Sequence, residues 1–189
     1  MKRVYTFTKN WLLSLFFLLL LSASAFADQN DVRLAELFRS LKSTESVSRA
    51  SVFESKIWHI WMEHHDPEVE ISMLHGVEAM KLQQFEQAFV HFSLLIKLAP
   101  DYAEGWNKRA TVLYLMGRFK ESEADVMKTL ELAPRHFGAL SGQGLIKIAF
   151  QDWTGAIYFL ESALKINPHM HGVIMHLKYA RKRHKESMT

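Results

Sequence analysis

Three of the four prolines in this 189-residue chain, Pro100, Pro134 and Pro168, stand 34 residues apart. Each closes a short amphipathic run. Proline lacks a backbone N–H and biases the preceding residue away from the helical conformation, so each proline predicts the end of a helix. A fixed interval of this length is typical of a solenoid built from one repeated supersecondary unit. The chain is therefore expected to stack similar helical units.

The repeated unit becomes visible when residues 69–102, 103–136 and 137–170 are aligned. A small residue comes early in each unit and a second follows twelve positions later, giving the pairs Gly76 and Ala88, Ala110 and Ser122, Gly144 and Ala156. Apolar residues recur at three- and four-residue spacing in both halves of each unit, which predicts two amphipathic helices. The small residues would let these two helices approach closely where they cross.

These features resemble the tetratricopeptide repeat (TPR): the 34-residue period, Trp106 near the start of the second unit, the small-residue pairs and the terminal prolines. The resemblance covers residues 69–170, although Ser72 and Leu140 replace the tryptophan in the other two units and Lys147 stands where the family usually has an aromatic residue. It implies an all-α fold, a right-handed α-solenoid of three helix hairpins.

Both flanks of the repeats are expected to be helical caps, because terminal units of a solenoid otherwise expose an apolar face. Residues 28–68 predict two helices, at roughly 30–42 and 46–65, which would stack on the first repeat as an N-terminal cap. Residues 171–189 predict a C-terminal capping helix that continues into a basic tail, with Val173 and Leu177 facing inward.

Residues 1–27 have the layout of a secretory signal peptide. Lys2, Arg3 and Lys9 precede an apolar run over 11–21, and Ala25-Phe26-Ala27 offers a small-x-small site, so cleavage is expected after Ala27. The apolar run is shorter than the roughly 20 residues of a membrane-spanning helix. The expected location is the periplasm or the exterior, and a membrane contact is expected only if the leader stays uncleaved as an anchor.

The charge balance gives no electrostatic case for nucleic acid. The whole chain has 23 Lys and Arg against 20 Asp and Glu, and loss of the three basic residues of the leader leaves 20 of each. The chain has no cysteine, so no disulfide framework accompanies export.

The resemblance further implies that the first helix of each unit lines a concave groove used to bind peptides or partner proteins. Carried over position by position, it assigns twelve residues to that groove: Glu70, Met73, Val77, Met80, Glu104, Asn107, Lys108, Thr111, Tyr114, Ser141, Leu145 and Ile148. Within each unit their spacing of three and four independently places them on one helix face. Some of the methionines have an alternative interpretation as packing residues.

The groove assignment predicts a non-catalytic scaffold for a peptide or protein partner, with no cofactor. Relatives that grip a C-terminal carboxylate use a ring of Lys, Asn and Arg, whereas the matching positions here are Met73, Val77, Lys108, Gly138 and Gly142. Only one cation is present, so carboxylate capture is not expected.

The sequence bears on three other kinds of function. Catalysis is not expected, because the chain lacks a cysteine nucleophile, G-x-S-x-G, a phosphate-cradling glycine loop and H-E-x-x-H. A small-ligand or copper-handling protein is the main alternative, using His64 and His65 or His169 and His171 with methionines, although the spacing fixes no third ligand. Self-association through Trp58 and Trp61 or through the convex face is the third.

Overall fold

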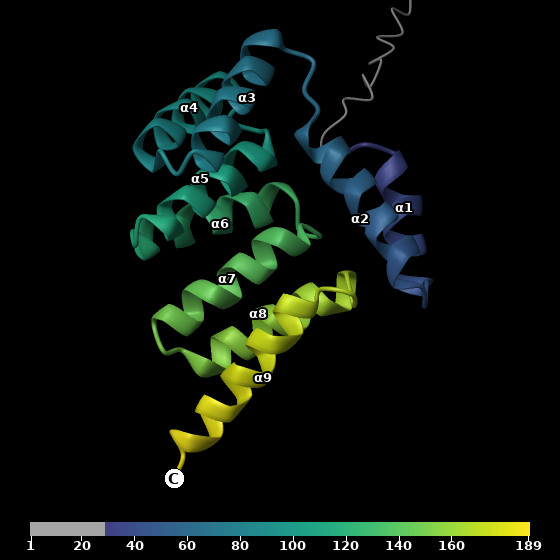
Figure 1. The fold of residues 1–189 in the computed structure, drawn as a ribbon, viewed down its shortest axis with the longest axis vertical. Coiled ribbons are helices and arrows are strands. Elements are labelled where there is room, and N and C mark those ends of the chain that lie inside the picture. The colour runs from purple at the N-terminus through teal and green to yellow at the C-terminus, as the bar shows by residue number, and fades with distance from the viewer. Residues whose placement is uncertain (1–28) are drawn as a thin grey trace, which may run out of the picture.

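The computed structural model describes residues 29–189, so the expected leader and its cleavage site lie outside the described part of the chain. Within this part the chain is all helical, as expected, with no strand (Figure 1). The helices are α1 (Arg33–Ser43), α2 (Val47–Met62), α3 (Pro67–Lys81), α4 (Phe85–Leu98), α5 (Ala103–Leu115), α6 (Phe119–Leu132), α7 (Phe137–Ala149), α8 (Trp153–Ile166) and α9 (His171–Glu186).

Helices α3 to α8 form three successive hairpins, α3–α4, α5–α6 and α7–α8, stacked in chain order with α9 following (Figure 1). The turns inside the hairpins share one backbone geometry: Gln83, Gly117 and Gln151, each 34 residues from the next, have φ values of 59°, 74° and 58°. Such a left-handed residue closes a helix by letting the next N–H reach back to an earlier carbonyl. Thus Arg118 N–H bonds the Leu113 carbonyl at 2.8 Å, and the outer turns repeat this bond.

The small residues lie where the paired helices cross. A Cβ added to Gly76 would come within 2.5 Å of the Phe92 ring, and one added to Gly144 within 2.6 Å of Leu160. In the middle unit, the buried Ser122 hydroxyl donates a 2.7 Å hydrogen bond to the Ala110 carbonyl, so its polar group is satisfied at the contact. Each second helix ends two residues before its proline.

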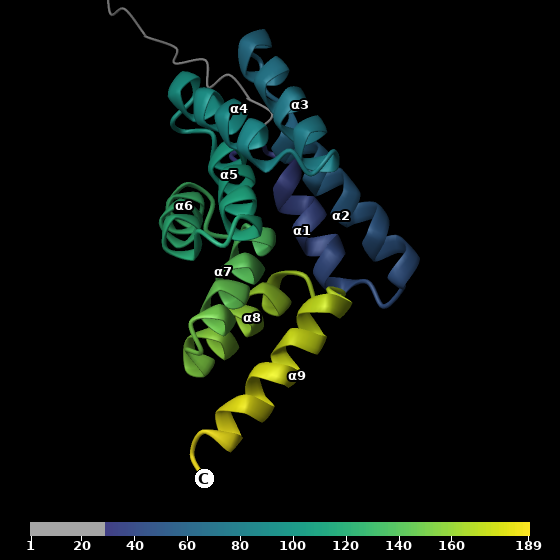
Figure 2. The same cartoon turned by 60° about the vertical axis from the view of Figure 1, so that its left-hand side comes forward.

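The sequence had suggested that the α1–α2 hairpin stacks on the first repeat. In the structure it does not. It lies along one side of the array, reaching from the start of α3 to the α8–α9 link (Figures 1 and 2). Its core combines buried Leu34, Leu41 and Ile57 with Phe137 of α7 and Met170 of the α8–α9 link. Glu54 of α2 accepts a 3.1 Å hydrogen bond from Asn167.

The last residue of each repeat holds the hairpin in this position. The Tyr102 hydroxyl donates to the Trp61 carbonyl at 2.7 Å, the His136 ring stacks on Trp61 at 3.9 Å between centroids, and Met170 packs against the hairpin core. Trp61 is only 2% exposed, and Trp58 is half-buried against the same core. The suggestion that Trp61 belongs to an exposed surface for self-association was therefore wrong.

No helix among residues 29–189 combines the length and apolar character needed to cross a membrane. The C-terminal helix α9 packs on α8 through buried Val173, Leu177 and Ala180.

Candidate functional site

A cavity of about 180 Å³ opens between α5 and α7, the first helices of the second and third units. Five of the twelve expected groove residues line it: Asn107, Thr111, Tyr114, Ser141 and Leu145. The other lining residues are Ala110, Ser122, Val126, Gly138, Gly142 and Ile146. The expected face of these two helices therefore gathers around one hollow.

The cavity is uncharged and its deep part is formed by small or apolar side chains. Ala110, Ser122 and Val126 are buried, and the Ser122 hydroxyl is already bonded to the Ala110 carbonyl. An apolar cavity of roughly 150 Å³ is large enough to bind benzene. This cavity therefore has room for one uncharged side chain, up to aromatic size, entering from the groove.

The first unit contributes nothing to this cavity. Met73 is 4% exposed and fills the core between α3 and α4, which corrects its assignment to the groove. Val77 and Met80 are half-buried against the same core, and Glu70 is exposed. These methionines are packing residues, the alternative that the sequence had left open.

Ile148 is also placed differently from the expectation. It lies near the end of α7, half-buried against the cluster that α8 and α9 share with Leu140. Apolar surface at this end of the third unit is therefore used to hold the capping helix.

The expected groove residues Glu104 and Lys108 belong to a buried polar cluster beside the cavity. Lys108 Nζ lies 3.0 Å from Glu104 Oε1, and the Asn107 amide donates to Glu104 Oε2 at 3.0 Å. His136 Nδ1 accepts the Ala139 N–H, so the neutral ring carries its proton on Nε2, which donates to Glu104 Oε2 at 2.8 Å. Two hydrogen-bond donors and one ammonium group thus converge on one carboxylate that is 1% exposed.

This convergence keeps Glu104 ionised. Burial by itself would raise the pKa of Glu104, but the Lys108 ammonium and the His136 hydrogen bond outweigh it and lower the pKa. The cluster also connects to the hairpin, because Trp61 stacks on His136 and Lys108 lies 5.4 Å from the Trp58 ring centroid. The charged groups beside the cavity, Glu104 and Lys108, are therefore already bound within the protein.

His136 and its role were not predicted from the sequence. His136 stands at the end of the second unit, 32 residues from Glu104, so no local spacing links the two. A signal was present in the repeat register: Tyr102, His136 and Met170 are large side chains at the same position of the three units.

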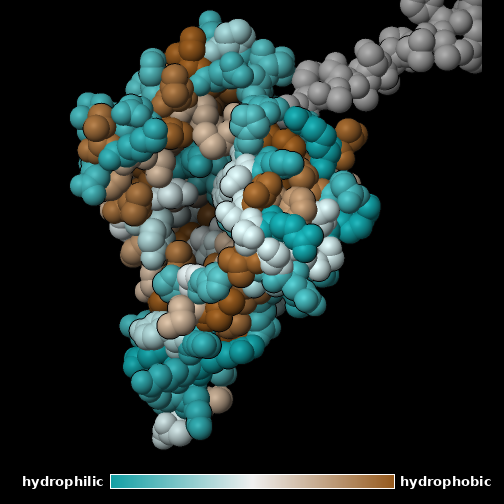
Figure 3. All heavy atoms as spheres, turned by 45° about the vertical axis from the view of Figure 1, so that its right-hand side comes forward, coloured by the Kyte–Doolittle hydropathy of each residue, from teal (hydrophilic) through white to brown (hydrophobic). Residues whose placement is uncertain are grey.

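The hairpin forms a wall next to the cavity. Gly138, a cavity residue, lies so close to α2 that an added Cβ would come within 2.6 Å of the Trp58 ring. The face drawn in Figure 3 is hollowed between the array and the hairpin. The open part of the groove is therefore bounded by α5, α7 and α2.

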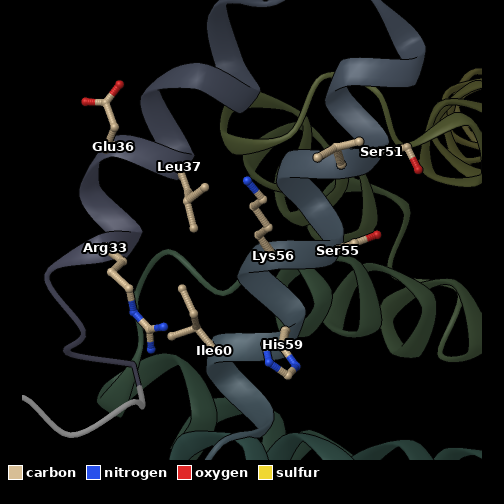
Figure 4. A pocket seen from close by; sticks show the side chains of 9 residues that line it. Arg33, Glu36, Leu37, Ser51, Ser55, Lys56, His59 and Ile60 are labelled. Carbon is tan, nitrogen blue, oxygen red and sulfur yellow. The ribbon is translucent and has the colours of Figure 1, made fainter.

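A wider depression of about 800 Å³ lies on the outer face of the hairpin (Figure 4). Leu37, Lys56 and Ile60 point into it from α1 and α2. Arg33 at its edge is bound to Asp31 and Glu63, each at 2.8 Å. Only two helices contribute to this surface, and none of the expected groove residues lies there.

The histidines considered for metal binding do not form a cluster of ligands. The His64 and His65 rings stack at 4.5 Å between centroids just after α2, while His169 lies in the α8–α9 link and His171 begins α9. Among residues 29–189, no group of three or more His, Cys, Asp or Glu side chains is arranged to hold an ion.

Comparison with known proteins agrees with this geometry. No family model matches the chain. A TPR repeat-containing protein of Rhizobium etli is 35% identical over 114 residues, which cover 60% of this chain and 56% of that protein. The TPR2B domain of yeast Sti1, solved in complex with pHsp70, superposes with a TM-score of 0.60 at 23% identity, covering 62% of this chain and 99% of that domain.

The fold is a tetratricopeptide-repeat array. The Hsp70-Hsp90 organizing protein of Triticum aestivum is 31% identical over 107 residues, covering 57% of this chain and 18% of that protein. The chain thus spans about half the length of the Rhizobium protein and a small part of the wheat protein. The likeness to the solved TPR domains concerns the arrangement of helices.

Proposed function

We propose that this chain is a non-catalytic binding module that takes an extended segment of a peptide or protein in the groove between α5, α7 and α2. The observation that carries the proposal is the uncharged cavity, around which five groove residues converge. A groove already formed in the free protein needs little ordering when a ligand binds, which favours recognition of short segments.

The cavity favours an uncharged anchor side chain in the ligand. The yeast Sti1 domain was solved with pHsp70, which supports peptide recognition by this fold. In this chain, however, Lys108 already pairs with Glu104 and lies over Trp58. Binding an acidic terminus would require breaking that cluster, so the ligand proposed here presents an apolar side chain, with Asn107, Thr111 and Ser141 available to its main chain.

We further propose that the module works in the cell envelope of a bacterium. This part rests on the leader sequence: the basic start, the apolar run over 11–21 and the Ala25-Phe26-Ala27 site. Fractionation of cells that produce the full-length protein, with N-terminal sequencing of the mature form, tests it. A chain found in the cytoplasm and starting at Met1 would refute this part.

Filling the cavity tests the binding proposal without removing any contact. A Cβ at Gly142 meets no atom within 4 Å, so Gly142→Leu can place its side chain in the cavity while α7 stays intact. The matched control is Gly172→Leu in the first turn of α9, where a Cβ likewise meets nothing within 4 Å.

The readout is the set of proteins recovered with each variant after crosslinking in cells. The proposal predicts that partners captured by the wild type and by Gly172→Leu are lost with Gly142→Leu, while neither variant unfolds at a lower denaturant concentration than the wild type. Equal capture by Gly142→Leu would refute the groove as the binding site. Metal analysis of the same purified protein tests the alternative, because a stoichiometric ion lost on His169→Ala and His171→Ala would favour it.

A further inference from the structure

Within the described part of the chain, the α1–α2 hairpin leaves the first end of the array uncovered. In the second and third units, the residues that face the preceding unit are buried: Gly105 and Ala139 at one register position, Val112 and Ile146 at another. The same two positions of the first unit are Ile71, which is 53% exposed, and Glu78, which is also exposed. Leu74 beside them is 64% exposed. Among residues 29–189, no second helix of a preceding unit covers this face of α3.

At the other end of the array, no helix among residues 29–189 covers the outer side of α9. Helix α9 occupies the place of a fourth first helix, and its buried residues pack on α8. Its outer side exposes Met175 and Tyr179, at 62% and 47%. Lys178 stands where the three units have Gly76, Ala110 and Gly144, so a tightly crossing partner from a regular repeat would not fit.

The two ends carry opposite charge. Helix α3 and the first turn of α4 present exposed Glu68, Glu78 and Glu86, and the one Lys or Arg among their exposed residues, Lys81, is paired with Glu78 at 3.3 Å. Helix α9 carries five bases against the single acid Glu186: Lys178, Arg181, Lys182, Arg183 and Lys185. Some of these are already paired, as Arg181 is with Glu161 at 2.7 Å, but the excess remains positive. An acidic, apolar stripe at one end thus complements a basic, apolar stripe at the other.

We propose that copies of this chain associate head to tail, with α9 of one copy packed against α3 of the next. The contact covers the exposed side of both helices. Ile71 and Leu74 cover Met175 and Tyr179, while the glutamates face the lysines beside them. The two contacting surfaces are different, so the contact is heterologous. A dimer still has one unused surface at each end, so association continues into short open chains.

The contact is small, because one helix from each copy supplies most of it. Interfaces of this size are weak and transient. Charge contributes to the contact at the surface, so salt must weaken it. The inference predicts a mass that rises with concentration and an association constant that falls by at least about tenfold between about 0.05 M and about 0.5 M salt.

Complementary variants distinguish this assembly from the other possible ones. Ile71→Lys blocks the α3 surface and Met175→Glu blocks the α9 surface, and both residues are more than half exposed, so folding is preserved. Sedimentation velocity on protein expressed from the full-length gene measures the mass of each variant alone and of an equimolar mixture. Each variant alone is expected to be monomeric, and the mixture is expected to form dimers but nothing larger.

Three results would overturn the inference. The first is a wild type that stays monomeric from micromolar to near-millimolar concentration at low salt. The second is a Met175→Glu variant that still dimerises, which would indicate a symmetric contact between two α3 surfaces. The third is an Ile71→Lys variant that still dimerises, which would indicate a contact between two α9 helices. Circular dichroism of both variants confirms that a monomeric result does not arise from misfolding.

Discussion

Replacing Trp61 by alanine tests whether the α1–α2 hairpin is an integral wall of the groove. The indole is 2% exposed and stacks on the His136 ring, with 3.9 Å between the ring centroids. The ring centroids of Phe137 and Trp58 each lie 5.1 Å from that of Trp61, and the centroid of Phe38 lies 6.0 Å away. Truncating a buried tryptophan removes its apolar contacts and leaves a cavity, at a cost of about 3–5 kcal/mol. Because these contacts join α2 to α7, the loss should fall on the docking of the hairpin.

Urea unfolding followed by circular dichroism and by tryptophan fluorescence measures this loss. The wild type is expected to unfold in one transition, and Trp61→Ala is expected to lower the free energy of unfolding by about 3–5 kcal/mol. The control is Tyr158→Ala on α8, which removes an aromatic ring that is 64% exposed and should change the free energy by about 0.5 kcal/mol or less. A loss below about 1 kcal/mol for Trp61→Ala, or a wild type whose hairpin unfolds in a separate step, would refute the packing described here.

Two further predictions concern the interior of the array. In α7, Gly142→Ala should raise the free energy of unfolding by up to about 1 kcal/mol, because its Cβ meets no atom within 4 Å and alanine favours helix. Gly144→Ala should lower the free energy of unfolding, because its Cβ would come within 2.6 Å of Leu160. Equal effects of the two substitutions in urea unfolding would contradict the close crossing of α7 and α8. Folding lowers the pKa of Glu104, so its contribution to stability is complete above the ordinary carboxyl pKa and disappears as pH falls through the lower folded-state value. The difference in unfolding free energy between wild type and Glu104→Gln should therefore be largest near neutral pH and shrink in acid, and a difference that grows in acid would show that the carboxylate is not stabilised by Lys108 and His136.

The array could be predicted from the sequence because its determinants are local and repeated. Pro100 ends a helix, and Gly76 and Ala88 let two neighbouring helices cross closely. The same residue types recur at the same spacing in the other two repeats. Even the left-handed turn residues Gln83, Gly117 and Gln151 follow the period, although only one of them is glycine. Local rules of this kind do not depend on how distant segments meet.

The site was predicted only in part, because it depends on contacts between distant segments. The face shared by Asn107, Thr111 and Tyr114 follows from helical spacing alone. The sequence could not show that Met73 would be drawn into the core, or that α2 would pack on His136 and Gly138 instead of on the first repeat. Periodicity predicts the apolar stripe of α2, but it does not say which surface that stripe covers.

Site-specific photocrosslinking tests the central claim most directly, since it reads out which face of the array touches the partner. A photoreactive amino acid would be placed at Leu145, in the cavity, and in a separate protein at Tyr158, an exposed position on α8. The account predicts a discrete crosslinked partner from position 145 that disappears when Gly142→Leu is added, and none from position 158. Crosslinks to the same partner from position 158, or from position 145 regardless of Gly142→Leu, would contradict it.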